Sequence, residues 1–303
     1  MAVIKENEIM KHILAFLPAI LFLSACSKGE SDAVVEPDVA ESEPVLNTGR
    51  LLSVDGSKTH IAYTYDDAGR VVHAEHFDST FFAWSMIKQV ADYRYAADRI
   101  YITYQEYAEL ANGERSMDYE RDFVRDDTLF LIDGRVDSLA GAMRNGSSFF
   151  FKFRYNEKGE LTNVKNQNIM PDRFGKLDGK PWYEELYTLE WHEGNVVRKT
   201  GITITSTRRD TTEWTYRYGS LTGSFVVSEP RNVLPDFEPL MQAGYFGKSC
   251  KNLFEGIETK SISDQREYLL DEQGKVIRMK SNVANSEGIR YDYTYRIKWA
   301  GKD

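Results

Sequence analysis

Hydrophobic and polar residues alternate along much of the chain after residue 50. In "YDYTYRIKW", residues 291–299, every second side chain is aromatic or apolar, and those between are charged or polar. "EWTYRY", residues 213–218, follows the same rule. A period of two places successive side chains on opposite faces of a strand. The pattern therefore predicts antiparallel strands with one apolar face and one polar face.

A short phrase recurs and predicts hairpins. Its best copies span residues 61–75, 151–165 and 266–280, and a copy one residue shorter spans 189–196. Apolar residues two positions apart precede a polar residue, a glycine and then Val or Leu. Asp and Asn bond to nearby backbone in turns, and glycine permits a positive φ. The predicted turn residues of the three full copies are Asp66, Gly69, Asn156, Gly159, Asp271 and Gly274. The phrase is therefore interpreted as architectural rather than catalytic.

These hairpins predict an all-β fold. The copies begin 90 and then 115 residues apart, which excludes a regular solenoid or propeller. We expect a curved antiparallel meander or barrel-like sheet of about 12–14 strands, and the pattern leaves open whether it closes. Prolines 230, 235 and 239 exclude a central strand in residues 228–256. A short helix near 236–245, capped by Asp236, is predicted there, packed on the open end of the sheet.

The N-terminus carries a targeting signal. Residues 13–23 form an uncharged apolar run that follows Lys11 and is too short to span a bilayer comfortably. Translation from Met10 would give a more basic start, so the start site stays open. "LSAC", residues 23–26, closely resembles the lipobox of bacterial lipoproteins, which implies cleavage before Cys26 and a lipid on its thiol. A buried helix or an inner-membrane anchor is the alternative.

Charge separates a tether from the body. The net charge is −9, of which −5 lies in residues 27–47 and −4 in residues 48–303. The body has no basic stripe, so nucleic acid is not an expected partner. The predicted domains are a signal peptide at 1–25, an acidic flexible tether at 26–47 and a single β-rich domain at 48–303. If Cys26 carries lipid, no disulfide is expected, because Cys250 is the other cysteine.

Two families share these features. "YTYDDAGRVV", residues 63–72, resembles the tyrosine-aspartate (YD) repeat of Rhs-type and teneurin shells. The chain as a whole resembles a family of Gram-negative lipoproteins with a domain of unknown function described as porin-like. The resemblance rests on the lipobox, the acidic tether, the irregular hairpins and "GYFGKSCKNL", residues 244–253. That resemblance implies a barrel-like β architecture and no known activity. Membrane-spanning barrels also alternate, but the lipobox and the non-aromatic C-terminus favour a domain in water.

Catalytic and metal motifs are not found. The chain has no P-loop, dinucleotide fingerprint, nucleophile elbow or HExxH sequence, so we expect no enzyme activity, cofactor or metal. His73 and Glu75 would share one strand face and His76 the other, which is poor metal geometry. The carboxylates in "EELYTLE", residues 184–190, offer no spacing typical of a catalytic pair, although a hydrolase remains the third class considered.

Aromatic residues near predicted turns are the candidates for ligand binding: Phe81, Phe82, Trp84, Trp182 and Tyr183. Such residues stack on sugars or anchor partners, or else fold back over the core. The predicted function is a lipid-anchored, non-enzymatic module that binds glycan or peptide. A structural lipoprotein that contacts another envelope protein is the alternative. Ser27, where Asp would mark inner-membrane retention in many species, points to the outer membrane, on its periplasmic face or at the cell surface.

Overall fold

The computed structural model describes residues 50–57, 59–78, 85–110, 112–116, 123–143, 146–170, 181–223, 231 and 237–300. This part of the chain forms sixteen strands and one short helix, α2 (Glu238–Gln242). The strands are β1 (Leu51–Asp55), β2 (Thr59–Tyr65), β3 (Val71–Asp78), β4 (Ser85–Tyr95), β5 (Arg99–Leu110), β6 (Phe123–Ile132), β7 (Arg135–Met143), β8 (Ser148–Tyr155), β9 (Leu161–Ile169), β10 (Tyr183–His192), β11 (Asn195–Thr205), β12 (Arg209–Thr222), β13 (Asn252–Glu258), β14 (Ile262–Leu270), β15 (Val276–Asn285) and β16 (Arg290–Trp299). No helix in these residues is long and apolar enough to cross a bilayer.

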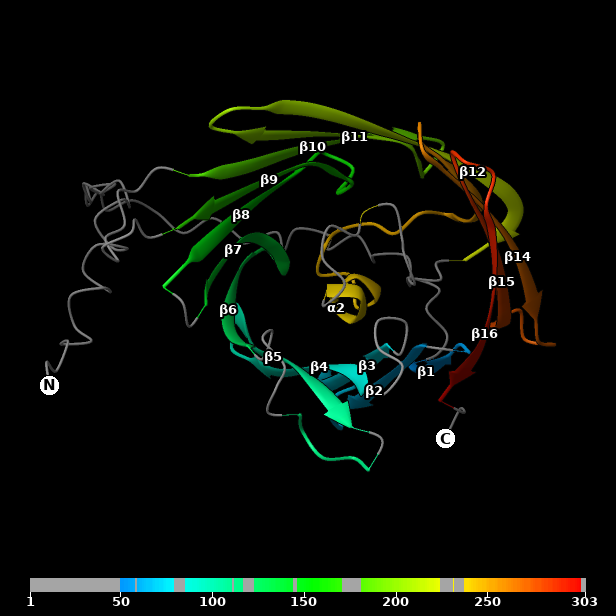
Figure 1. Cartoon of the computed structure of the whole chain (residues 1–303), viewed down its shortest axis with the longest axis horizontal. Helices are drawn as coiled ribbons and strands as arrows, with labels where there is room; N and C mark the ends of the chain where they lie inside the picture. The colour runs from blue at the N-terminus through cyan, green and yellow to red at the C-terminus, as the bar shows by residue number, and fades with distance from the viewer. Residues whose placement is uncertain are drawn as a thin grey trace, which may run out of the picture. The chain divides into compact units, whose positions relative to one another are not determined.

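The strands form a closed antiparallel barrel (Figure 1). Each strand pairs with its sequence neighbours, and β1 pairs with β16 to complete the ring. The predicted all-β class is confirmed, and the question of an open or a closed sheet is answered. The strand number, sixteen, exceeds the expected 12–14. Short strands explain the difference, because β1 and β13 contain only five and seven residues and show little alternation.

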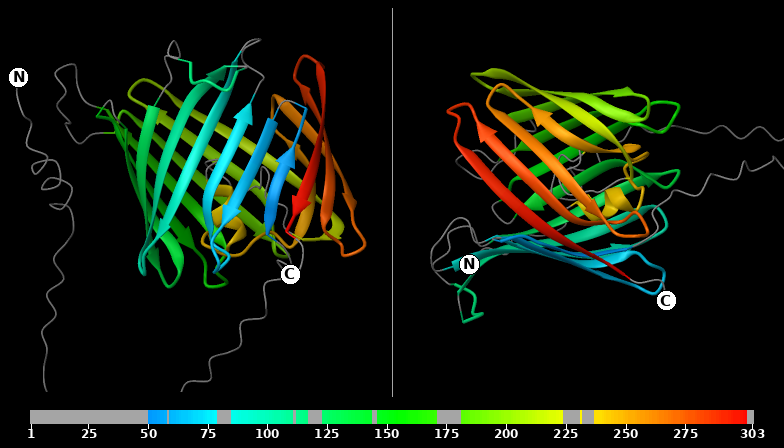
Figure 2. Two further views of the ribbon diagram at one scale, coloured as in Figure 1. Left: turned by 90° about the horizontal axis from the view of Figure 1, so that it is seen from below. Right: turned by 90° about the vertical axis from the view of Figure 1, so that its right-hand side faces the viewer.

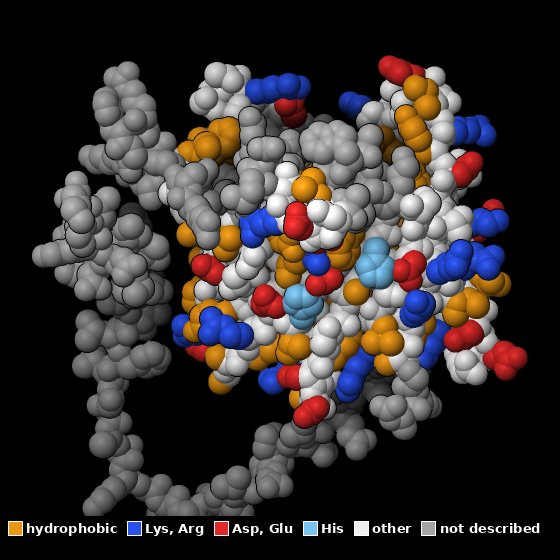
Figure 3. Space-filling view, turned by 60° about the horizontal axis from the view of Figure 1, so that its bottom comes forward, with side chains coloured by type: hydrophobic (Ala, Val, Ile, Leu, Met, Phe, Trp, Pro, Cys, Tyr) orange, Lys and Arg blue, Asp and Glu red, His pale blue; other side chains and the backbone are white. Residues whose placement is uncertain are grey.

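The two faces of the sheet differ in polarity. In β5, Ile100, Ile102 and Tyr104 point inward and are buried, while the outward residues between them are Tyr101 and Thr103. Cross-strand register extends this assignment around the ring, because partners in an antiparallel pair share a face. Charged outward residues occur on many strands: Lys88, Asp92, Lys165, Glu213, Lys280 and Arg296. Figure 3 shows acidic, basic and histidine side chains spread over one such face.

A plug, which we define as residues 237–251, occupies the inside of the barrel (Figures 1 and 2). Phe237, Leu240, Met241 and Phe246 are fully buried within the main core. The helix lies inside a closed barrel, so the expected position on an open sheet end is wrong. The N-cap residue is Phe237 and not the expected Asp236, which lies outside the described residues, and no described side chain caps the helix. A closed ring leaves its interior as the apolar surface against which this segment packs.

Backbone hydrogen bonds attach the plug to the barrel turns. Val136 N donates to Tyr245 O over 2.8 Å, and Lys248 N donates to Gly159 O over 3.0 Å. Both contacts lie where β6 turns into β7 and β8 turns into β9. We call this the plugged end, and we call the opposite end, where β3 connects to β4 and β9 to β10, the loop end.

The repeated aromatic residues form a ring of hydrogen bonds at the plugged end. Seven of the eight even-numbered strands carry a Tyr or Trp that donates to a backbone carbonyl of the preceding strand. The pairs are Tyr65–Leu51, Tyr95–Val71, Tyr155–Val136, Trp191–Leu161, Tyr218–Val196, Tyr268–Phe254 and Trp299–Val276, with lengths of 2.6–2.8 Å. In β6 the corresponding position holds Leu131. These bonds give the recurring aromatics a structural role that alternation alone does not reveal.

The turns of the phrase share one geometry. The Oδ1 atoms of Asp66, Asn156 and Asp271 each accept a hydrogen bond from the backbone N–H four residues later, at 2.8–3.0 Å. The glycines of these turns have φ values of +80°, +77° and +78°. A further full-length copy at Asn285, with Gly288 at φ +78°, was not recognised in the sequence, because Asn282 and Ala284 stand where the other copies carry aromatic or large apolar residues.

We expect Asp271→Ala and Gly274→Ala each to lower the free energy of unfolding by about 1 kcal/mol. The first removes the acceptor of the Lys275 N–H, and the second places a Cβ on a residue with φ +78°. Urea denaturation followed by circular dichroism measures both. Glu272→Ala in the same turn is the control and should change stability by less than about 0.5 kcal/mol. Equal stability of all three variants and the wild type would contradict an architectural role.

Candidate functional site

The inner wall of β9 to β12 carries polar and aromatic side chains. The register aligns Asn166 with Glu185, Tyr187 with Gly201, and Lys199 with Trp214. We call Asn166, Tyr183, Glu185, Tyr187, Lys199 and Trp214 the wall site. The wall site extends along the strands from Lys199 and Trp214, which lie near the plug, to Tyr183 at the loop end.

Lys199 is a buried cation that has no carboxylate partner in the part of the chain that the structure describes. Its side chain is only 9% exposed, and Nζ lies 4.7 Å from the ring centroid of Trp214 and 5.8 Å from that of Tyr187. No salt bridge to Lys199 is found among the described residues. Burial lowers the pKa of Lys199 to about 8, although the charge of Glu185 acts in the opposite direction. The aromatic rings therefore supply the contacts that stabilise this ammonium group.

Other buried cations of the barrel wall are paired. Arg125 Nε donates to Asp127 Oδ2 over 2.8 Å, and Arg266 Nε donates to Asp264 Oδ2 over 2.8 Å. Buried charges are normally compensated in this way, since an unpaired one is costly. Lys199 therefore departs from the rule that the rest of the wall follows.

Gly201 allows the two aromatic rings to approach each other. A Cβ at this position would lie 3.0 Å from both Tyr187 and Trp214, and the ring centroids of these two residues are 6.4 Å apart. The glycine therefore provides the space in which the rings and the Lys199 stem meet.

Asn166 carries an unused hydrogen-bond acceptor. Its Nδ2 donates to Glu185 Oε2 over 3.1 Å, but its buried Oδ1 has no partner among the described residues, and Asn166 is only 6% exposed. The hydroxyl of Tyr183 donates to Glu185 Oε1. Burial, followed by this contact with Glu185, raises the pKa of Tyr183 to about 12. Because a buried acceptor without a donor costs about 1–3 kcal/mol, Asn166 Oδ1 is suited to a hydroxyl or amine donor from a ligand.

Solvent reaches the wall site from the loop end. Thr212 points inward beside Gly201 and is exposed, and the Asp210 side chain is 44% exposed. Trp182, which precedes β10, is 50% exposed, and its ring centroid lies 5.6 Å from that of Tyr183. The wall thus changes from exposed at the loop end to buried at Lys199.

The predicted site residues have different positions. Tyr183 belongs to the wall site and Trp182 adjoins it, whereas Cys26, Phe81, Phe82 and Trp84 lie outside the described residues. Sequence reasoning missed Asn166, Lys199 and Trp214 as a group. An available signal was the alternation in β11, which places Lys199 on the inward, mostly apolar face.

The acidic run at 184–190 is divided by the sheet. Glu185 faces inward, whereas Glu184 and Glu190 face outward, where Lys165 Nζ lies 2.9 Å from Glu184 and Arg198 Nε lies 3.7 Å from Glu190. These carboxylates therefore do not converge on one cleft.

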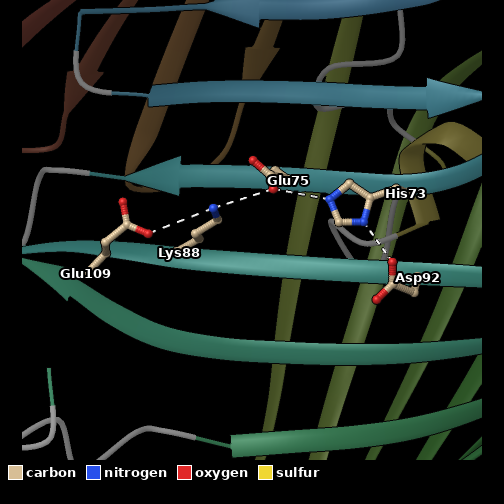
Figure 4. Close-up of polar contacts among 5 residues, drawn as sticks. All are labelled: His73, Glu75, Lys88, Asp92 and Glu109. Carbon is tan, nitrogen blue, oxygen red and sulfur yellow. Dashed lines mark hydrogen bonds and ion pairs between the residues drawn. The ribbon is translucent and has the colours of Figure 1, made fainter. Parts of the chain in front are cut away.

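The histidine cluster lies on the outer face of β3 to β5 (Figure 4). His73 Nδ1 lies 2.7 Å from Asp92 Oδ1, and Lys88 Nζ lies 3.4 Å from Glu75 and 3.8 Å from Glu109. Partial burial opposes protonation of His73, but hydrogen bonds to Asp92 and Glu75 outweigh it and raise the pKa of this imidazole. Within the described residues, no group of three or more His, Cys, Asp or Glu is arranged to hold a metal ion.

Comparison with known proteins shows a shared fold. No protein-family model matches the chain, and no curated protein matches it. The structure of a porin-like protein from Bacteroides uniformis is 15% identical, with a TM-score of 0.53, and the match covers 82% of this chain and 95% of that chain. A porin-like protein from Bacteroides vulgatus is 9% identical, with a TM-score of 0.56, and the match covers 84% and 100%. The chain therefore has the closed barrel fold of these porin-like proteins.

Proposed function

We propose that this protein is an outer-membrane lipoprotein that binds a saccharide on the inner wall of a barrel standing in water. The wall site carries the proposal, because it joins aromatic faces to polar groups on a surface that solvent reaches. Cys26 would hold the lipid. The fold shared with porin-like proteins supports a place in the envelope.

The outer surface supports a barrel in water. A lipid-facing Arg or Lys costs about 2–4 kcal/mol at the middle of a bilayer, and membrane barrels carry an apolar outer band. Here the outward middle of β15 carries Lys280 beside Thr294 of β16, and the outward middle of β12 carries Glu213. A lipid anchor would hold such a barrel at a membrane that its own surface does not enter.

The closed sheet favours saccharide over an extended peptide. Every described strand is paired on both sides, so a peptide cannot be added to a free edge. Tyr187 and Trp214 offer ring faces, which pack against the C–H faces of sugars. Glu185 and Asn166 offer acceptors to hydroxyl groups.

The anchor is tested by Cys26→Ala. We expect the variant to leave the membrane fraction and to lose label from a radioactive fatty acid, because the modified thiol is absent. Fractionation and autoradiography of cells that express each chain give the result. Ser27→Ala is the control and should remain labelled. Recovery of labelled Cys26→Ala in the membrane fraction would contradict the anchor.

Binding is tested by Trp214→Ala. Truncating this side chain should lower the affinity for any bound saccharide by about tenfold or more, because aromatic anchors contribute most of the binding energy at such sites. A glycan array screens the full chain, and calorimetry in mild detergent measures the affinity of the wild type and the variant. Phe150→Ala, which alters an outward aromatic that is 39% exposed, should not change the affinity. The absence of any saccharide with a Kd below about 1 mM would overturn the proposed function.

A further inference from the structure

We infer that the saccharide bound at the wall site is acidic, with a carboxylate that pairs with Lys199 and a hydroxyl that donates to Asn166 Oδ1. This inference rests on the proposed function and specifies its ligand as a sugar of the uronic acid class. Two groups that lack a partner among the described residues carry it, namely a buried ammonium without an anion at ion-pair distance and a buried acceptor without a donor.

The two groups lie on one surface at a suitable spacing. Lys199 stands two residues from Gly201 and four from Thr203 in the same strand, and Thr203 is in register with Glu185, the partner of Asn166. Residues two apart on a strand are about 7 Å apart, so Lys199 and Thr203 lie about 13 Å apart along it. The Lys199 stem shortens that distance, since its ammonium extends over the Tyr187 and Trp214 rings. One pyranose ring, or two linked rings, can span the distance that remains between Lys199 Nζ and Asn166 Oδ1.

The charge at the site selects among sugars. The carboxylate of Glu185 already receives hydrogen bonds from Tyr183 and Asn166, so it does not need Lys199 as a partner. A neutral sugar would leave the ammonium without an anion after its water is displaced, and that cost opposes binding. An acidic sugar supplies the anion, and because the protein carries a net charge of −9, non-specific attraction of anions does not explain such a preference.

The test compares trigalacturonic acid with its methyl ester, which has nearly the same size and ring faces but no charge. Calorimetry uses the full chain in mild detergent. We expect the acid to bind about tenfold or more tightly than the ester. Lys199→Met should abolish the difference, whereas Lys165→Met, which alters an outward lysine that is paired with Glu184, should preserve it. The same comparison is made with single sugars, galacturonic acid against galactose. It shows whether the site recognises a free sugar or only a sugar within a chain.

Measuring the affinity of the wild type at several pH values also tests whether the charge of Lys199 binds the carboxylate, without the need for a variant. Affinity for the acid should fall as the pH rises above about 8, where Lys199 loses its proton, and affinity for the ester should not. The other titratable groups that point inward from β9 to β12 are Glu185, Asp210 and the phenols of Tyr183, Tyr187, Tyr216 and Tyr218. Burial raises the pKa of Tyr183, Tyr187 and Tyr216, so these phenols keep their protons in this range.

The outcomes separate the two proposals. Equal binding of the acid and the ester would overturn the acidic ligand and leave the saccharide site in place. A preference that survives Lys199→Met would also overturn it, because another group would then hold the carboxylate. If no sugar of either kind binds, both proposals fail.

Discussion

Gly247→Ala is expected to lower the free energy of unfolding by about 3 kcal/mol or more. Gly247 has φ +75°, and a Cβ there would lie 2.3 Å from the carbonyl oxygen of Gly159 and 3.0 Å from the Tyr155 ring. A backbone oxygen cannot rotate away as the end of a side chain can. The plug would have to shift away from the β8–β9 turn, and the neighbouring hydrogen bond from Lys248 N to Gly159 O would be lost.

Gly244→Ala is the matched control for this variant. Gly244 also lies in the plug and has φ +83°, but a Cβ there would meet nothing within 4 Å. Its cost should therefore be the conformational strain alone, about 1 kcal/mol. Urea midpoints with unchanged slopes measure both changes. If both substitutions lowered the free energy of unfolding equally, the close contact between Gly247 and the Gly159 carbonyl would not exist.

Lys199→Met is expected to raise the free energy of unfolding at neutral pH by about 3 kcal/mol. The folded pKa of about 8 lies below the usual lysine value of 10.5, so the unfolded chain binds this proton more tightly. Protonated Lys199 therefore opposes folding, and methionine of similar length removes the charge while keeping the packing. A gain in stability from replacing a site residue is typical of a group retained for binding rather than for folding.

The pH dependence of this gain has a definite sign. Below about pH 8 both states carry the proton, and the gain is at its maximum. Between about pH 8 and the unfolded value of 10.5 the folded wild type is deprotonated first, so its stability rises and the gain shrinks. Denaturation of the wild type and Lys199→Met at several pH values measures it. A gain that stays constant across this range, or Lys199→Met less stable at neutral pH, would show that the ammonium is compensated.

Alternation predicted most of the strands because it reports directly on a sheet with one buried face. Tyr293 and Tyr295 point inward and Asp292 and Thr294 outward, as the pattern of residues 291–299 indicates. The closure of the barrel could not be predicted, since pairing of β1 with β16 depends on sheet curvature and not on either strand's composition. The position of the plug depends on that closure.

The wall site illustrates a different limit. Asn166 and Glu185 are bonded, and Lys199 approaches Trp214, but these residues come from four strands joined by connections of unequal length. Their proximity follows from the register of β9 to β12. A one-residue shift of any of these strands would turn its side chain to the outer face. Trp182 and Tyr183 could be predicted as candidates because they lie beside a turn, and a turn can be recognised from a single sequence.

The closing pair of strands has a kinetic consequence. Leu51 of β1 is in register with Trp299 of β16, so the contact that seals the ring joins nearly opposite ends of the folded chain. Contacts of such long sequence separation form slowly, because ordering the chain between them comes before the gain from the contact. Until β16 arrives, β1 and β15 each present an unpaired edge, which is a template for aggregation. The nearly complete barrel is therefore the species most in need of protection by chaperones, and its lifetime is set by the last strand to be made.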